Sequence, residues 1–361
     1  MLFVGDIASP NIRCSNDLGM ILNRYPQVFK NKSIVANLEG MISETARLTT
    51  DTPILFNHPS VLDVLAEGNG KLLVGLANNH MLDLPGEFDR TVELLTRKGI
   101  IYGGAGRSPK EAASPIVFEQ GGVNTMLFNA CWDFLLYHQK NPSSGVYLSE
   151  INERNLLESV STARSNDPSA TIAIFFHWNF DLETLPFPAH RTFAKALIDN
   201  GANVVVGAHS HCVQGGEAYG DGYIIYGLGN FFIPNSTFVN GKLTFPEWSS
   251  LQMAFEYEPI SNRAFCHWFK YRYEGGHHYL DLVESRPFED SELLKQHSPY
   301  YNLTHKPYIK FFKSQRRKKA LIPIYENHQH VIRNKVKTEF LKKRAGIARL
   351  FARLGLVKWQ S

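Results

Sequence analysis

Residues 202–211 read ANVVVGAHSH, and the rest of the fold can be worked out from this stretch. The three valines at 204–206 are typical of a buried strand. Gly207 then lets the backbone turn, and His209 and His211 follow. In an extended chain, side chains two residues apart lie on the same side, so we expect both imidazoles to face one object. Imidazole is the commonest protein ligand for a divalent transition metal, although paired histidines also occur as ordinary surface or core residues.

Other apolar runs in the chain also end in side chains that can hold a metal. Beyond the strand ends at 4, 36, 76 and 176 stand Asp6, Asn37 with Glu39, Asn78 with Asn79 and His80, and His177 with Trp178. In open α/β sheets the ligand site lies outside the carboxyl ends of the strands, so we expect these side chains to meet. A single polar residue at a strand end is usually there to form a turn. Turn formation does not explain why several successive strands all end in potential metal ligands.

The ligand types narrow the chemistry. Carboxylate, amide oxygen and imidazole together favour Mn, Fe or Zn over Ca²⁺ or Mg²⁺. One carboxylate can bridge two ions about 4 Å apart, and such a pair activates water for hydrolysis. The residue types therefore permit a site for two divalent metal ions as cofactors. His80 follows the amide ligand Asn79 and suits a catalytic role, either protonating the leaving group or stabilising transition-state charge.

The chain divides into a large α/β domain, residues 1–285, and a basic, mostly helical C-terminal extension, residues 286–361. Within the first part, helical patterns occupy residues 151–163 and 188–200. Alternating runs at 251–258 and 264–273 predict a hairpin that covers one sheet edge.

Composition supports a globular protein with an unusual distribution of charge. The 361 residues are 43% hydrophobic and 12% aromatic, which are globular values. The net charge of +4 combines +13 in residues 310–361 with −9 in the remainder. Residues 331–358 carry a basic amphipathic pattern. We expect this tail to contact a membrane surface or a polyanion, with a merely solvated tail as the alternative, and we expect no nucleic-acid partner.

Cysteine usage and hydropathy bear on the cellular location of the protein. The cysteines at 14, 131, 212 and 266 form no C-x-x-C pair, which argues against a structural zinc site or a redox motif and fits a reducing compartment. No apolar run reaches the roughly 18 residues that a membrane span needs, and the N-terminus lacks a signal-peptide pattern. We predict a cytoplasmic protein with peripheral membrane contact through its tail.

Taken in order, the motifs resemble a known family, and the resemblance covers roughly residues 1–260. The motifs are Gly5-Asp6, Asn37-Leu38-Glu39, Ala77-Asn78-Asn79-His80, His177-Trp178, Gly207-Ala208-His209-Ser210-His211 and Leu228-Gly229-Asn230-Phe231. The pattern is similar to the CapA type of capsule biosynthesis proteins, also called the PgsA type, linked to poly-γ-glutamate capsules. That family in turn resembles the calcineurin-like metallophosphoesterases.

The resemblance implies a four-layer α/β/β/α sandwich with a dinuclear metal site. Carried over to this chain, one metal ion is held by Asp6, Glu39 and His211, and the other by Glu39, Asn79, His177 and His209. We assign substrate binding to Asn37, Asn78, Trp178 and Asn230. The implied function is a metal-dependent hydrolase of a phosphoester or an amide/ester bond, acting on an anionic polymer or a phosphoester in capsule or cell-surface polymer biosynthesis. The alternative is a non-catalytic biosynthesis or export factor that docks through its basic tail.

The chain also departs from the family pattern. Ala8 stands where the wider phosphoesterase pattern has a histidine ligand, and Glu39 replaces the bridging aspartate. Residues 179–181 read Asn-Phe-Asp instead of Gly-x-Glu, and Ser210 stands where proline is common. The change at position 8 predicts a weaker first site, so that a single tightly bound metal is the alternative to two. The family's N-terminal membrane anchor has no counterpart in the sequence, which favours a cytoplasmic role.

Overall fold

The computed structural model describes residues 1–48, 54–68, 70–138, 144–318 and 321–353. Its main strands form two sheets. The first sheet has the order β18 (His277–Pro287), β17 (Arg263–Glu274), β16 (Leu251–Glu258), β1 (Leu2–Ile7), β2 (Ile34–Leu38), β5 (Leu72–Gly75) and β6 (Ile101–Gly103), with β15 (Asn230–Phe232) also paired to β1. The strands from β1 to β6 in this order are parallel, and β16 to β18 add an antiparallel meander.

The second sheet has a parallel centre and an antiparallel strand at each edge. Its order is β13 (Val213–Tyr219), β14 (Gly222–Leu228), β12 (Val204–Ala208), β11 (Thr171–His177), β9 (Val123–Cys131) and β8 (Ile116–Gln120). Two short pairs lie outside both sheets, β3 (Met41–Ile42) with β4 (Phe56–Asn57) and β7 (Ala105–Gly106) with β10 (Tyr147–Leu148). The parallel centre brings the carboxyl ends of β11 and β12 side by side.

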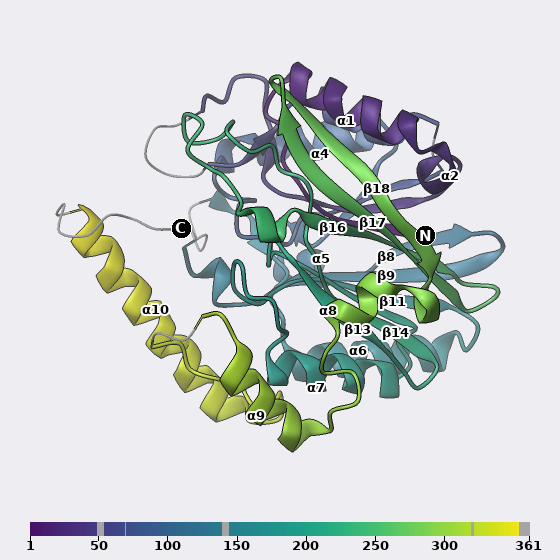
Figure 1. Cartoon of the computed structure of the whole chain (residues 1–361), viewed down its shortest axis with the longest axis vertical. Helices are drawn as coiled ribbons and strands as arrows, with labels where there is room; N and C mark the ends of the chain where they lie inside the picture. The colour runs from purple at the N-terminus through teal and green to yellow at the C-terminus, as the bar shows by residue number, and fades with distance from the viewer. Residues whose placement is uncertain (49–53, 69, 139–143, 319–320, 354–361) are drawn as a thin grey trace.

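Helices cover the outer faces of the two sheets, and Figure 1 shows α1 and α4 on one side and α6 and α7 on the other. The first sheet is covered by α1 (Ile12–Arg24), α2 (Pro26–Phe29), α3 (Ser60–Ala66) and α4 (Phe88–Arg97). The second is covered by α6 (Glu153–Asn166), α7 (Pro188–Asp199), α9 (His305–Gln315) and α10 (Val331–Arg353). Shorter elements are α5 (Pro109–Ala113), α8 (Glu292–His297), η1 (Pro85–Glu87), η2 (Leu135–His138), η4 (Glu247–Ser249) and η5 (Phe288–Asp290). The predicted α/β/β/α sandwich is confirmed.

The alternation of side chains along β1 explains why this strand is apolar on both faces. Leu2 and Val4 lie in the cluster beneath α1 and α3, whereas Phe3 lies between the two sheets. The Phe3 ring lies 6.0 Å from that of Phe175 in β11. A strand that is buried on both faces requires a continuous run of apolar residues. Polar residues can follow only beyond the point where the strand is no longer buried.

Several local predictions are confirmed. The helical patterns at 151–163 and 188–200 correspond to α6 and α7, and the predicted hairpin is β16 with β17. All four cysteines are free and buried. Among the described residues, no helix combines the length and the apolar character that a membrane crossing requires.

The segment after β18 is helical and packs on the outer layer of the second sheet. Tyr308 of α9 and Leu341 of α10 are buried in the same apolar cluster as α7. A buried ion pair lies where this segment packs: Arg191 of α7 donates to both carboxylate oxygens of Glu217 in β13 at 2.5 and 2.6 Å. The same guanidinium donates to the Leu303 carbonyl at 2.7 Å. The basic helix predicted at 331–358 is observed to residue 353, and its last part lies outside the described residues.

His190 of α7 is a buried histidine that should make the fold sensitive to acid. Its ring stacks on that of Trp178 at a centroid distance of 4.6 Å, and no described residue forms a hydrogen bond with its Nδ1. Burial lowers the pKa of His190 to about 3, whereas histidine in an unfolded chain titrates near 6.5. Between these values the unfolded state binds more protons, so the free energy of unfolding falls as the pH drops below about 6.5.

We expect the His190→Phe variant to lose about 2 kcal/mol less stability than the wild type between pH 7 and pH 5. Phenylalanine keeps the stacked ring and removes the proton-binding site. Urea unfolding of both proteins at the two pH values measures the difference. Equal losses in the two proteins would show that His190 does not titrate differently on unfolding.

Candidate metal centre

The predicted metal ligands come from five segments of the chain and meet at one place between the two sheets. Asp6 lies in β1 and His177 ends β11, while the others follow β2, β5 and β12. All of these strands are parallel to a neighbour in their sheet, so their carboxyl ends lie at the same edge. The structure brings together the whole predicted set, which is Asp6, Glu39, Asn79, His80, His177, His209 and His211.

His177 is the residue that links most of these groups. Its Nδ1 lies 3.7 Å from Asp6 Oδ1, and its Nε2 lies 3.8 Å from Glu39 Oε1. The same Nε2 is 2.6 Å from Asn79 Oδ1. The carboxylate of Asp6 also accepts the backbone N–H of His209 at 3.1 Å. These contacts place imidazole, carboxylate and amide oxygen around one small volume.

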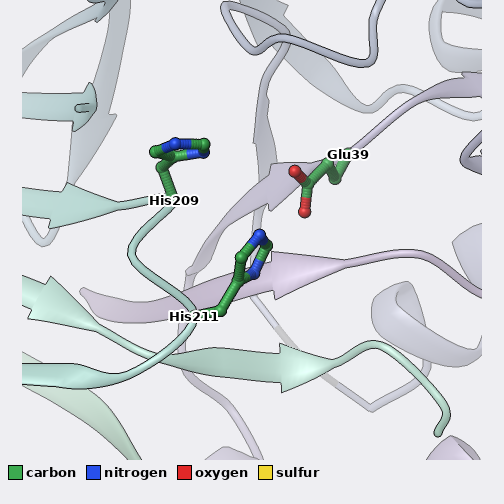
Figure 2. A group of neighbouring side chains, drawn as sticks. All are labelled: Glu39, His209 and His211. Atoms are coloured by element: carbon green, nitrogen blue, oxygen red, sulfur yellow. The ribbon is translucent and has the colours of Figure 1, made fainter. Parts of the chain in front are cut away.

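Glu39, His209 and His211 form the tightest group of potential metal ligands. One ligand atom from each lies within 4.8 Å of the others, and all three residues are buried. Figure 2 shows the Glu39 carboxylate facing the region between the two imidazoles, which come from the loop after β12. In the ligand sets implied by the resemblance, His209 and His211 hold different ions and Glu39 bridges them, and this spacing is compatible with that arrangement.

The backbone brings the two imidazoles together in a way that the sequence did not predict. We expected an extended chain at residues 209–211, but β12 ends at Ala208. His209 and His211 instead adopt φ values of 86° and 53°. A side chain in this left-handed region is strained, so the surrounding structure must hold the turn. The two rings converge because of this strained turn and not because of strand alternation.

The chemistry of Glu39 shows that a cation fits the site. Its carboxylate is fully buried, and neither oxygen has a hydrogen-bond partner among the residues that the structure describes. Burial, followed by the neighbouring carboxylates of Asp6 and Asp181, raises the pKa of Glu39 well above its ordinary value. A buried carboxylate without a partner is strongly unfavourable. A divalent cation beside it would offset this cost, and the neutral histidines around it supply the remaining ligands.

The histidines are in the protonation state that metal binding needs. Burial lowers the pKa of His209 to about 3. Burial, with a further contribution from His209, lowers the pKa of His177 well below its ordinary value. Both rings are therefore neutral near pH 7, and a neutral imidazole has a nitrogen lone pair available for a metal.

Three of the residues assigned to substrate binding hold the predicted ligands in place. Asn37 donates to Asp6 Oδ1 at 2.8 Å, and Asn78 donates to the Asn37 side-chain oxygen at 3.3 Å. Asn230 Oδ1 lies 2.6 Å from His211 Nδ1, so the Nε2 of that ring is directed away from Asn230. Partners of this kind fix ligand orientation.

The structure does not bring Trp178 to the site. Its side chain is fully buried in the cluster beneath α7, and its Nε1 donates to the Tyr226 carbonyl at 2.8 Å. In this conformation the indole cannot contact a substrate, and its role is packing behind His177.

His80 and Asp83 form a pair that the sequence interpretation missed. His80 Nδ1 lies 2.6 Å from Asp83 Oδ2, and His80 Nε2 lies 4.0 Å from Glu39 Oε1. Asp83 also accepts the backbone N–H of Leu55 at 3.0 Å. An acid that binds Nδ1–H fixes the tautomer of a catalytic histidine, and here it directs Nε2 towards the centre.

We expect Asp83→Asn to lower hydrolysis of a generic phosphodiester by about 10- to 100-fold, the range typical for partners that orient site residues. Metal content should stay unchanged, because Asp83 acts on the centre by holding His80, which is not one of the predicted ligands. Elemental analysis and steady-state kinetics on the same preparation check both statements. Loss of metal in this variant would show that Asp83 itself contributes to metal binding.

Asp181 is the second residue that sequence reasoning missed. Its Oδ1 lies 3.1 Å from His209 Nε2 and 3.9 Å from His211 Nε2, and its side chain is half-exposed. Burial opposes ionisation, but His209 and His211 outweigh it and lower the pKa of Asp181. The signal was present in the sequence, because Asp181 occupies the glutamate position of the family pattern. Ala8, where a ligand was expected to be absent, lies in an apolar cluster.

Comparison with known proteins identifies the family of this chain. Residues 3–235, well over half of the chain, match the family model described as "Bacterial capsule synthesis protein PGA_cap". The chain belongs to this family. The C-terminal extension that starts after β18 lies outside the PGA_cap match.

Two curated relatives carry capsule-related names. The PGA_cap chain is 29% identical over 170 residues to "Capsule biosynthesis protein CapA" of Bacillus anthracis, a stretch that covers 45% of this chain and 40% of the relative. It is 28% identical over 160 residues to "PGA biosynthesis protein CapA" of Bacillus subtilis (strain 168), covering 43% and 40% respectively. The match thus spans less than half the length of either relative.

Solved structures give distant likenesses. One is a hypothetical protein from Thermus thermophilus, with 16% identity and a TM-score of 0.41, covering 79% of this chain and 96% of that one. Another is the calcineurin-like phosphoesterase YfkN from Bacillus subtilis, with 11% identity and a TM-score of 0.38, covering 86% and 98%. At these scores the likenesses carry no information about the chemistry of this chain.

Proposed function

We propose that this PGA_cap chain is a metal-dependent hydrolase of a phosphoester or an amide/ester bond in capsule or cell-surface polymer biosynthesis. The observation that carries the proposal is the buried carboxylate of Glu39, which lies beside His209 and His211 and has no hydrogen-bond partner in the described part of the chain. A protein that needed only packing at this point would gain stability from an apolar residue. Selection for a cation site accounts for the carboxylate.

The metal ligands in this proposal are Asp6, Glu39, Asn79, His177, His209 and His211. Divalent Mn, Fe or Zn suits this donor set, with two ions sharing Glu39 or one tightly bound ion. Such ions, when bound, polarise the scissile bond and lower the pKa of an attacking water. Asn37 and Asn230 fix the orientation of the metal-ligating side chains Asp6 and His211. The polar rim of the site binds the anionic substrate.

His80 is the proposed catalytic acid. Its Nε2 faces Glu39 while Asp83 holds its Nδ1, so a proton on Nε2 points at the centre. Donation of that proton to a leaving oxygen or nitrogen completes hydrolysis, and Asp83 stabilises the charge that His80 carries beforehand.

The test is metal content and turnover measured together. We expect elemental analysis of the wild type to find one to two divalent metal ions per chain, and hydrolysis of bis(p-nitrophenyl) phosphate. His209→Ala should lose both, whereas His80→Ala should keep the metal and lose turnover. A wild type without metal and without turnover would reject the hydrolase in favour of a non-catalytic biosynthesis or export factor.

A second role, membrane docking, is favoured by the outer face of α10. Ile332, Val336, Phe340 and Ile347 are 81%, 64%, 49% and 56% exposed and follow helical spacing along this face. Lysines and arginines at 333, 343 and 344 lie on the same side, and α10 runs along the periphery of the molecule (Figure 1). An apolar stripe flanked by cations fits an anionic membrane surface. Free buried thiols suit the reducing cytoplasmic side of such a membrane.

Vesicle flotation tests this second role. The full chain should float with vesicles that contain 30% phosphatidylglycerol and not with purely neutral ones. Ile332→Ser should weaken binding by about tenfold, because it removes one apolar side chain from the interface. Ile260→Ser is the matched control, since Ile260 is 79% exposed on a distant turn. Equal binding of wild type and Ile332→Ser would assign the tail to solvent.

A further inference from the structure

The connection between α9 and α10 attaches two basic residues, Arg317 and Lys318, to loops that reach the metal centre. Glu183, a buried carboxylate, accepts the backbone N–H of Arg317 at 3.2 Å and that of Lys318 at 3.0 Å. Glu183 follows Asp181 by two residues, and Asp181 contacts His209 directly. The extension is therefore fastened to the same loop that reaches the predicted ligands.

A second loop of the site holds Arg317 from the other side. The guanidinium carbon of Arg317 lies 3.8 Å from the ring centroid of Trp248 in η4, a cation–π contact. The same loop carries Phe245, whose ring centroid lies 4.9 Å from that of His211. Both loops that hold the basic segment thus also touch the histidines of the centre.

The side chains of Arg317 and Lys318 are not engaged in direct ion pairs within the described structure. Within the part of the chain that the structure describes, neither Arg317 nor Lys318 forms an ion pair with a carboxylate. The nearby acid Glu247 pairs instead with Lys270 at 3.0 Å.

We propose that Arg317 and Lys318 form a subsite that binds the anionic groups flanking the bond at the metal centre. This inference rests on the proposed hydrolase function and specifies its substrate class. The substrate is an oligoanion, with phosphate or carboxylate groups repeated along a chain, and not a small molecule with one charge. Arginine offers a planar fork to such groups and lysine a mobile point charge. The specificity residues come from the extension, outside the family match at 3–235.

Calorimetric titration of the full chain tests the subsite with two probes, tripolyphosphate and hexaglutamate, each with and without added Mn²⁺. The Arg317→Gln/Lys318→Gln variant should bind at least one probe about tenfold more weakly than the wild type, as expected when charge-assisted hydrogen bonds are lost. Lys310→Gln/Lys313→Gln removes the same charge from α9 and should bind like the wild type. The probe that discriminates identifies phosphate or carboxylate as the recognised group.

The test of the subsite can be distinguished from the test of the proposed hydrolase function. Metal content and thermal midpoint of the subsite variant should equal those of the wild type, and the difference in anion binding should persist without Mn²⁺. If the wild type binds no metal, the hydrolase fails while the subsite is still measured. Equal binding of both probes by variant and wild type, or binding of neither by the wild type, overturns the subsite.

Discussion

Glu39→Gln should abolish hydrolysis, with a loss of at least about 10³-fold, and should lower metal content to the background of a metal-free preparation. Glutamine has nearly the shape of glutamate. It lacks the negative charge that would bind one cation or bridge two. Glu39 is also the predicted bridge, so its loss affects both ligand sets. Elemental analysis and phosphodiester turnover measure the two effects.

The same substitution should act in the opposite direction on the metal-free protein. There the carboxylate is buried and lacks a hydrogen bond from any described residue, and an amide at that position costs less to bury. We expect the free energy of unfolding of the metal-free protein to rise by about 1–2 kcal/mol. Addition of Mn²⁺ should raise the thermal midpoint of the wild type and leave that of the variant unchanged.

Glu158→Gln is the control for this experiment. Glu158 lies on the exposed face of α6 and pairs with Arg154 at 3.2 Å, so its loss should change stability by less than about 0.5 kcal/mol. Metal content and turnover should stay at wild-type values. If Glu39→Gln keeps its metal and its activity, Glu39 is not a ligand and the proposed centre is wrong.

Glu217→Gln should produce the largest loss of stability, about 3 kcal/mol or more. It leaves the guanidinium of Arg191 buried without its carboxylate, and breaking a buried pair in this way typically costs 3–5 kcal/mol. Glu217 also accepts the hydroxyl of Tyr226 at 2.9 Å and pairs with Lys195 at 3.0 Å. Urea unfolding monitored by circular dichroism gives the difference.

The exposed pair of Glu258 with Arg263 provides the matched control. Its N–O distance is 3.0 Å, and both side chains are accessible to solvent, so Glu258→Gln should cost less than about 1 kcal/mol. Equal effects at Glu217 and Glu258 would mean that burial does not govern the strength of these pairs. The comparison also measures how firmly the C-terminal extension is joined to the core, because Arg191 donates to Leu303.

Much of the fold and the site was predictable because the relevant signals are local. A strand that is covered on both faces must be apolar throughout, as the run ending at Val206 is, and polar residues can follow only where cover stops. In parallel sheets these strand ends lie at one edge. For that reason Asp6, Glu39, His177 and His209 could be grouped before any contact between them was known.

The contributions of Asp181, Asp83 and the Arg317–Lys318 segment could not be predicted in the same way. Asp181 reaches His209 across a loop, and Arg317 lies more than a hundred residues from the loop that anchors it. No pattern in a short stretch of sequence indicates a contact between residues so far apart along the chain. Trp178 belongs to the same class, since only the packing of α7 shows that its indole is buried and not presented to a substrate.

The sequence by itself determined which residues stand at the strand ends and which ligand chemistry they offer, because strand alternation and apolar runs are properties of neighbouring residues. Only the tertiary structure decided how those residues meet. The positive φ values of His209 and His211, the unpaired carboxylate of Glu39 and the basic rim from the extension all depend on contacts between segments distant in sequence. Their energies are set by burial, and burial exists only once both sheets and their helical layers have assembled.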